Sequence, residues 1–191
     1  CEDTRVTSRL LASEKIRKPL RALHHHSTQA EMRPVLEDLR EGKNIVYVSD
    51  AGTPGISDPG GKLVEAVARA LLDVAIVPIP GPCAAIAALS VSGFPADHFS
   101  FFGFPPHKKG RKTYFDELAV NSSTLVLYES THRVLKTLGE LEKRIGDRLI
   151  VVCRELTKLH ETTYRGTARE VTVALEHDSV KGEFVIVIAP I

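Results

Sequence analysis

Two apolar runs in the second half of the chain are followed directly by side chains that can take part in acid–base chemistry. Glu155 and Lys158 come after the run 149–153, and Tyr128 and Glu129 stand at the end of an earlier run. A carboxylate or an amine beside a substrate hydroxyl can orient that hydroxyl or remove its proton. An ion pair across a loop is the more common arrangement of such residues, so both interpretations stay open at this point.

A loop rich in glycine and proline, SDAGTPGISDPGG at 49–61, follows another apolar run. Its glycines let backbone N–H groups approach a ligand closely, and Asp50 stands at the carboxyl end of a predicted strand. A tight connection with two helix caps fits the same residues equally well. The spacing excludes the two common nucleotide-phosphate loops, because the loop has no G-x-G-x-x-G and Lys62 is followed by Leu63 instead of Ser or Thr.

A second break, IPGPCAA at 79–85, separates an apolar run from a helix of small residues. It too offers backbone donors, although a close-packed alanine helix is the simpler interpretation. No metal is expected. The adjacent His24, His25 and His26 point in different directions in a helix or a strand, so we expect them on partly exposed surface. The three cysteines form no CxxC or zinc pattern, which favours a reducing cytoplasm.

Positive charge gathers in one loop beside an aromatic run. The loop carries His107, Lys108, Lys109, Arg111 and Lys112, and the run carries Phe99, Phe101, Phe102 and Phe104. Such a loop can bind an anion, including the phosphates of a nucleic acid. A solvated loop between domains is the slightly favoured interpretation from these residues alone.

The composition is that of a globular protein rather than a disordered or fibrous chain, with 43% hydrophobic and 26% charged residues among 191. This length suits one domain or two small ones. Lys and Arg number 25 against 24 Asp and Glu, so any contact with nucleic acid must rest on a local patch. No apolar run approaches the ~18 residues of a membrane helix.

The apolar pattern predicts an α/β fold in which strands and helices alternate. Strands are predicted at 44–49, 74–79, 99–104, 124–128, 149–153 and 184–188. Helices are predicted at 6–16, 35–39, 59–72, 83–91, 133–144 and 167–176. In the third helix we expect Asp58 as the cap, Pro59 as the first residue and Leu72 at the end of the apolar stripe. The alternation predicts βαβ units with a mainly parallel sheet, whose ligands bind at the carboxyl ends of the strands.

Six segments, in this order, together resemble one protein family: SDAGTPGISDPG, PIPGP, FFGFPP, YESTHR, CRELTK and KGEFVIVI. The chain is similar, over essentially its whole length, to the tetrapyrrole-methylase superfamily. Within that superfamily, DAGTPGISDPG is specific to the branch that methylates a cytidine ribose 2′-hydroxyl of small-subunit ribosomal RNA. The PGP and RE pairs alone would be weak signals.

The resemblance implies two α/β domains, 1–93 and 94–191, with S-adenosylmethionine bound in the cleft between them. It also implies a homodimer in the cytoplasm, with no membrane contact, that acts on small-subunit ribosomal RNA or on the assembled small ribosomal subunit. The family usually starts with a further strand that ends in a Pro-x-Gly-Asn loop. Because this chain begins after that strand, we expect an enzyme that lacks its N-terminal strand.

Matching positions carry the family's functional residues onto this chain. The implied cofactor-binding residues are Asp50, Gly52, Thr53, Cys83, Ala84, Tyr128, Glu129, Leu156, Phe184 and Val185. A ribose hydroxyl is a poor acid, so we expect a base or a charge that favours the alkoxide, supplied by Glu155 and Lys158. Arg5 and Arg133 are the second candidates for that role. The expected RNA-binding residues are Lys108, Lys109, Arg111, Lys112 and Arg133.

Two other functions remain as alternatives. One is a methylase of a tetrapyrrole or corrin, the small-molecule chemistry that names the superfamily. Those branches generally carry a shorter Gly-Asp-Pro form of the loop at 49–61, which weighs against this alternative. The other is a non-catalytic module that binds a nucleotide-like ligand and regulates a partner.

Overall fold

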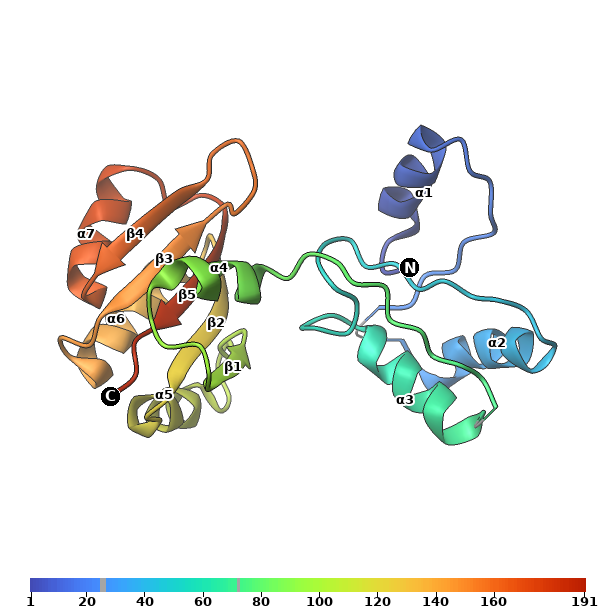
Figure 1. The fold of residues 1–191 in the computed structure, drawn as a ribbon, viewed down its shortest axis with the longest axis horizontal. Coiled ribbons are helices and arrows are strands. Elements are labelled where there is room, and N and C mark those ends of the chain that lie inside the picture. The colour runs from blue at the N-terminus through green and yellow to red at the C-terminus, as the bar shows by residue number, and fades with distance from the viewer. Residues whose placement is uncertain (25–26, 72) are drawn as a thin grey trace. The chain divides into compact units, whose positions relative to one another are not determined.

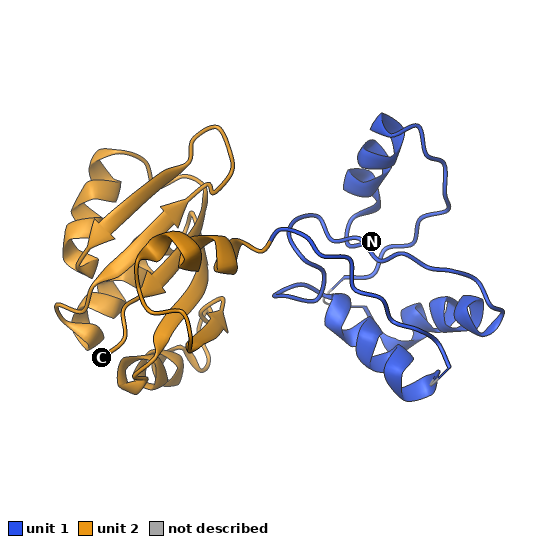
Figure 2. Ribbon diagram, viewed as in Figure 1, with its two compact units in different colours: residues 1–82 blue, residues 83–191 orange. Residues whose placement is uncertain are grey.

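A computed structural model describes residues 1–24, 27–71 and 73–191, and it divides the chain into two compact units. Unit 1 comprises residues 1–82 and unit 2 residues 83–191 (Figure 2). The predicted domain boundary after residue 93 stays a prediction, and in the structure the helix that precedes it belongs to unit 2. The predictions for His25, His26 and Leu72 lie outside the described residues. Within the described residues, no helix combines the length and apolarity needed to cross a membrane.

Unit 2 is built on a five-stranded sheet with the strand order β1-β2-β5-β3-β4 (Figure 1). The strands are β1 (Phe99–Gly103), β2 (Thr124–Ser130), β3 (Ile150–Arg154), β4 (Thr162–Gly166) and β5 (Glu183–Ile188). Four of them confirm predicted strands. β4 was not predicted from the sequence, because it is short and only partly buried.

The prediction of a mainly parallel sheet is wrong for unit 2. Only β1 and β2 pair in parallel, whereas β5 pairs antiparallel with both β2 and β3, and β4 pairs antiparallel with β3. The reason is that β5 enters between two strands that share a direction and runs against both. A hydrophobic strand buried on both faces gives the same sequence pattern in either orientation, so the direction of β5 could not be predicted from its sequence.

Side chains alternate between the two faces of this sheet. On one face, Leu127, Val152 and Ile186 join a core cluster with α5 (Arg111–Val120), α6 (Val134–Ile145) and α7 (Ala168–His177). On the other face, residues that include Val126, Cys153 and Val185 pack against α4 (Ala84–Ser92). Burial of both faces explains why these strands read as continuous apolar runs. The predicted basic loop ends earlier than expected, because Arg111 and Lys112 lie in the first turn of α5.

Helix α4 is fixed to the sheet at its C-terminal end by an arginine of β4. The Arg165 guanidinium donates hydrogen bonds to the carbonyls of Val91 and Ser92, the latter at 2.7 Å. These carbonyls belong to the last turn of the helix, where intrahelical partners are lacking. Gly93 then ends the helix in the left-handed conformation with a φ of 81°. The charge of Arg165 also complements the negative end of the helix dipole.

Unit 1 contains three helices among its described residues: α1 (Thr4–Ser13), α2 (Gln29–Arg40) and α3 (Gly60–Ala70). α2 begins earlier than predicted because Thr28 and Glu31 form a capping box, and Pro34 lies inside the helix. α3 begins after Pro59, which is its N-cap, and the Asp58 carboxylate instead accepts hydrogen bonds from Gly55 and Gly60. A small core packs α2 against α3, formed by Leu23, Met32, Val35, Leu63 and Val67.

The predicted strands at 44–49 and 74–79 are not strands in the structure. Both segments are irregular, and among the described residues neither pairs with a neighbouring strand. A strand needs a ladder partner for its N–H and C=O groups, so apolar β-branched composition alone does not make one. As a result Val46, Val77 and Ile79 are each more than two-thirds exposed.

Replacing Arg165 with alanine is expected to lower the free energy of unfolding by about 1.5 to 3 kcal/mol, the range for hydrogen bonds to charged groups. The loss follows from two carbonyls at the end of α4 that would lose their donor. Urea denaturation followed by circular dichroism measures the change. Arg169→Ala, an exposed arginine of the neighbouring α7, is the matched control and should change stability little. Equal effects of the two variants would contradict this account of α4.

Candidate functional site

Three strand ends meet at one edge of the sheet in unit 2. β2 ends at Ser130 and β3 at Arg154, while β5 begins beside both, with Ser130 opposite Glu183. The guanidinium of Arg154 is almost buried and donates hydrogen bonds to the carbonyls of Lys181 (2.6 Å) and His160 (3.3 Å). It therefore holds the segment before β5 and the loop after β3 together at this edge, which Figure 1 shows between β2, β3 and β5.

The predicted pair Glu155 and Lys158 lies at this edge. The Glu155 carboxylate accepts hydrogen bonds from the Glu183 N–H at 2.8 Å and from the Lys158 ammonium at 3.0 Å. The same ammonium donates to the Glu183 carboxylate at 3.0 Å. Glu155 adopts a φ of 51° and Thr157 a φ of 65°, so the loop turns sharply enough to bring Lys158 back over Glu155. The geometry makes Lys158 a bridge between two carboxylates.

These contacts fix the charges of the pair. The Glu183 N–H and then the Lys158 ammonium hold the pKa of Glu155 below its usual value. The carboxylates of Glu183 and Glu155 in turn raise the pKa of Lys158. Because a carboxylate with a lowered pKa is a weaker base, Glu155 is suited to orienting a partner rather than removing a proton. Lys158 remains a fixed positive charge, nearly half exposed to solvent.

Glu129, an expected cofactor contact, is instead enclosed by protein. Its side chain is fully buried, and its two oxygens accept hydrogen bonds from Arg133, the Ser130 N–H and the Thr137 hydroxyl. Thr137 in turn accepts from the Arg111 guanidinium at 2.9 Å. With these partners the carboxylate holds the start of α6 against the start of α5.

The two arginines of this network also hold the segment that follows β1. Arg133 donates to the Pro105 carbonyl at 2.8 Å, and Arg111 donates to the Pro106 carbonyl at 3.1 Å. The Arg111 guanidinium also lies over the Phe115 ring, 4.9 Å from its centroid. Both arginines were expected to bind RNA, but their guanidinium groups are largely occupied by protein partners and buried or nearly so.

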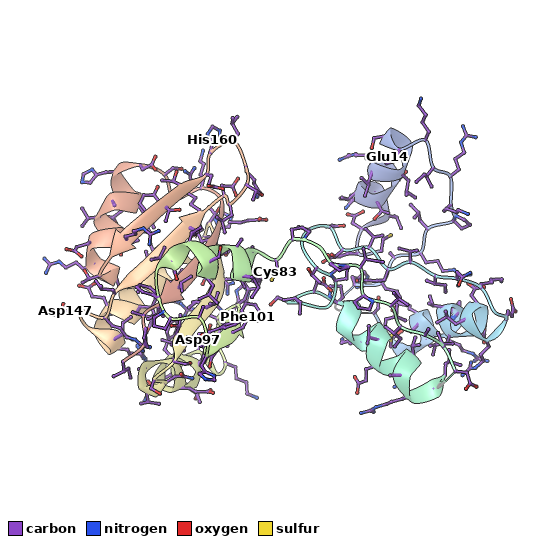
Figure 3. The ribbon with its side chains drawn as sticks, viewed as in Figure 1. Glu14, Cys83, Asp97, Phe101, Asp147 and His160 are labelled. Atoms are coloured by element: carbon purple, nitrogen blue, oxygen red, sulfur yellow. The ribbon has the colours of Figure 1, made fainter. Side chains whose placement is uncertain are left out.

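Tyr128 joins the end of β2 to the start of α4. Its phenol oxygen accepts a hydrogen bond from the Ala85 N–H at 3.1 Å, and burial raises its pKa to about 12, so the phenol stays protonated. The rings of Phe101 and Phe104 pack against Tyr128 with centroids 5.0 and 5.4 Å away. The N-cap of α4, Cys83, makes no side-chain cap hydrogen bond, which leaves N–H groups of the first turn other than that of Ala85 for an acceptor. Figure 3 shows Cys83 and Phe101 on the same side of unit 2.

The remaining cofactor candidates of unit 2 differ in where their side chains lie. Val185 packs in the cluster under α4, and Leu156 packs half-buried against the same cluster. Phe184 is buried in the opposite cluster with α6 and α7, so its ring is directed away from α4. The structure therefore brings Tyr128, Leu156 and the start of α4 together and leaves only the backbone of Phe184 near this side.

In unit 1 the structure brings the loop at 49–61 onto the PGP segment. The Thr53 hydroxyl donates to the Pro82 carbonyl at 3.0 Å, and Gly52 lies close to the same carbonyl with a φ of 70°. A Cβ at Gly52 would be 3.7 Å from that oxygen, so the positive φ, not lack of space, favours glycine there. Asp50 is exposed and accepts a hydrogen bond from the Asp3 N–H at 3.4 Å.

The remaining charged candidates are distributed over both units. Lys108, Lys109 and Lys112 are exposed around the start of α5. Arg5, a second candidate for the catalytic charge, pairs with Asp3 at 2.6 Å in unit 1. Among the described residues no group of three or more His, Cys, Asp or Glu side chains could hold a metal ion.

Sequence reasoning missed three residues of the sheet edge: Thr131, Gly182 and Glu183. The Thr131 hydroxyl exchanges hydrogen bonds with Gly182, and Glu183 contacts both members of the predicted pair. All three stand in the segments YESTHR and KGEFVIVI, so they were in view. An antiparallel β5 would have placed them beside Glu155, but the prediction of a parallel sheet hid this.

Comparisons with known proteins agree with this architecture. The model of the family described as Tetrapyrrole (Corrin/Porphyrin) Methylases matches residues 1–172. Ribosomal RNA small subunit methyltransferase I of Haemophilus influenzae is 44% identical over 191 residues, which covers 98% of this chain and 67% of that protein.

Solved structures show the same fold. The methyltransferase CobJ superposes with a TM-score of 0.65 at 20% identity, covering 98% of this chain and 87% of that one. Uroporphyrin-III C-methyltransferase from Thermus thermophilus, complexed with S-adenyl homocysteine, superposes with a TM-score of 0.61 at 19% identity, covering 95% and 80%. Since the family model spans residues 1–172 and a relative is 44% identical along almost the whole chain, this protein belongs to the tetrapyrrole (corrin/porphyrin) methylase family.

Proposed function

We propose that this protein is an S-adenosylmethionine-dependent methyltransferase that methylates the 2′-hydroxyl of a cytidine ribose in small-subunit ribosomal RNA. The observation that carries the proposal is the 44% identity, over 98% of the chain, to a protein named ribosomal RNA small subunit methyltransferase I. The specific loop DAGTPGISDPG supports the same branch. The proposed acceptor is free ribosomal RNA or the assembled small ribosomal subunit.

The proposed cofactor fits the residues that the structure provides. In unit 2 the uncapped start of α4 offers N–H donors at Ala84, and the half-buried Tyr128 and Leu156 offer apolar surface beside it. In unit 1 the exposed Asp50 offers a carboxylate for hydroxyl groups, next to the glycine-containing turn at Gly52. When bound, S-adenosylmethionine supplies an electrophilic methyl group on a sulfonium ion. Among the earlier cofactor candidates, Glu129 and the Phe184 ring are assigned structural roles because they are buried.

Lys158 and Glu155 have separate roles in this proposal. Held at Ala84, Tyr128 and Leu156, the cofactor would supply its methyl group to the 2′-oxygen and its sulfur would keep the electron pair of the carbon–sulfur bond, while the hydroxyl proton would leave to solvent. The positive charge of Lys158 stabilises the negative charge that develops on the 2′-oxygen as its proton departs. Glu155 holds that ammonium at 3.0 Å and thereby fixes where the charge acts.

The proposed RNA contact is the group of exposed lysines at the start of α5. Lys108, Lys109 and Lys112 are exposed, and the segment before them is held by the buried Arg111 and the half-buried Arg133. Phosphate contacts need accessible cations on a defined backbone, and these three meet that description. Arg111 and Arg133 set the position of the segment in this proposal rather than contacting phosphate.

The assembly and location are also part of the proposal. A homodimer in the cytoplasm is what the family resemblance implies for this chain. Light scattering coupled to size-exclusion chromatography of the full-length protein measures the mass. A mass of one chain at micromolar concentration would contradict the dimer.

Transfer of labelled methyl from S-adenosylmethionine tests the function directly. The full-length protein is offered isolated small ribosomal subunits, free ribosomal RNA and a precorrin. Label on a ribose of RNA is expected, and the acceptor that reacts identifies its assembly state. Label in the macrocycle alone would favour a corrin methylase, and cofactor binding without any transfer would favour a regulatory module.

Lys158→Met is expected to lower kcat for RNA methylation about 10- to 100-fold, because it removes a charge that stabilises the developing oxyanion. Lys158→Arg keeps the charge and should retain more activity than Lys158→Met. Lys136→Met, an exposed lysine of α6, is the matched control. Single-turnover methylation measures each rate. A normal rate for Lys158→Met would remove this residue from the mechanism.

Replacing Lys108, Lys109 and Lys112 together with glutamine is expected to weaken RNA binding and to flatten its salt dependence. The slope of log K against log salt should change by about 2 to 3, as expected when three phosphate contacts are lost. Cofactor affinity, measured by calorimetry, should stay unchanged. A triple variant at Lys136, Lys143 and Arg169 removes the same charge elsewhere in unit 2. An unaltered slope in the first variant would show that these lysines are solvated surface residues that do not contact phosphate.

A further inference from the structure

The Thr131 hydroxyl is tied twice to the backbone of one glycine. Its oxygen accepts a hydrogen bond from the Gly182 N–H at 2.8 Å, and its hydrogen is donated to the Gly182 carbonyl at 2.7 Å. Thr131 directly follows β2, and Gly182 directly precedes β5. One hydroxyl therefore fixes both polar groups of a residue that lies 51 positions away in the chain.

Gly182 is packed against the Glu155 side chain. A Cβ at this position would lie 2.6 Å from the Glu155 Cγ and 3.0 Å from its Cδ. Its φ of +127° is also one that other residues rarely adopt. The absence of a side chain at Gly182 is thus what leaves room for the carboxylate arm of Glu155, and any shift of this backbone would move that arm.

The next residue continues the same chain of contacts. The Glu183 N–H donates to the Glu155 carboxylate at 2.8 Å, and the Glu155 N–H donates to the Glu183 carbonyl at 2.9 Å. Lys158 then bridges the two carboxylates at 3.0 Å each. Direct contacts therefore connect Thr131 to Gly182, Gly182 to Glu155, and Glu155 to Lys158. The loop that carries Glu155 and Lys158 turns sharply and is exposed near its tip.

We propose that Thr131 is a positioning residue for the methyl-transfer site: by clamping the Gly182 backbone it sets the place of the Glu155 carboxylate and, through it, of the Lys158 ammonium. This inference rests on the proposed function, in which Lys158 supplies the catalytic charge. It assigns a role to a side chain whose hydroxyl makes both of these hydrogen bonds with Gly182. Thr131 acts on the ammonium through two intermediates, Gly182 and Glu155.

Thr131→Val tests the clamp, because valine keeps the shape and removes the hydroxyl. We expect kcat for RNA methylation to fall about 10- to 100-fold, the size of effect that follows displacement of a catalytic group by about 1 Å. KM for S-adenosylmethionine should change less than kcat, since the clamp acts on the Glu155 side chain, whereas Tyr128 and the start of α4 are held to each other by a separate hydrogen bond. Thr131→Ser restores the hydroxyl and should recover most of the rate.

A matched control separates positioning from stability. Thr124 lies at the opposite end of β2, is buried, and donates its hydroxyl to the Pro95 carbonyl at 2.6 Å. Thr124→Val therefore removes a threonine hydroxyl bonded to backbone from the same strand. It should lower the thermal midpoint without lowering kcat at 25 °C. If both valine variants lost activity in proportion to their midpoints, the positioning role would be overturned.

A second readout does not depend on activity. Carbon-13 NMR of the Glu155 carboxyl in the full-length protein reports its pKa, which is held low by the Glu183 N–H and Lys158. In Thr131→Val that pKa should rise toward the ordinary value for glutamate, whereas Thr124→Val and Thr131→Ser should leave it low. An unchanged titration in Thr131→Val overturns the inference. If the wild-type protein methylates no RNA, the proposed function fails, and this titration alone still decides whether Thr131 positions Glu155.

Discussion

The antiparallel insertion of β5 between β2 and β3 is the constraint on which the site of unit 2 depends. A strand that runs against two neighbours must begin where both of them end, and the pairing fixes this to the residue: Ser130 opposite Glu183 and Arg154 opposite Phe184. Ladder hydrogen bonds on both sides of β5 make its register costly to change. The acidic, basic and hydroxyl side chains at this edge are therefore positioned by the sheet itself and only secondarily by their loops.

This arrangement favours electrostatic help over proton removal. The Glu155 carboxylate accepts hydrogen bonds from a backbone N–H and an ammonium, and both interactions stabilise its ionised form. The Lys158 ammonium is thereby held in one position near the end of β3. Methyl transfer from a sulfonium donor needs alignment more than a strong base, so a rigid charge suits the proposed chemistry. Arg111 and Arg133 contribute by fixing the segment that precedes the exposed lysines.

The sequence alone predicted most of unit 2 and the location of its candidate site. Runs such as 124–128 and 184–188 are buried on both faces, so their strand character was evident, and the segments singled out as candidate sites lie at the ends of β2 and β3. What failed was strand direction, because periodicity carries no information about orientation. The strands expected at 44–49 and 74–79 failed for another reason, since pairing depends on partners that composition does not reveal. Likewise, Arg111 and Glu129 are buried because of tertiary packing. Their position in charged segments gave no sign of this burial.

The buried carboxylate of Glu129 has a consequence for how this part of the chain can vary. Its two oxygens serve Arg133, Ser130 and Thr137, and Thr137 passes the interaction on to Arg111. Losing the carboxylate alone would strand two largely desolvated guanidinium groups, whereas an apolar replacement of the whole set is a different and far less costly change. Substitutions here are thus strongly non-additive. A change at any one of the four side chains Glu129, Arg133, Thr137 and Arg111 is therefore constrained by the other three, and substitutions that replace all four together are expected to be tolerated better than single ones.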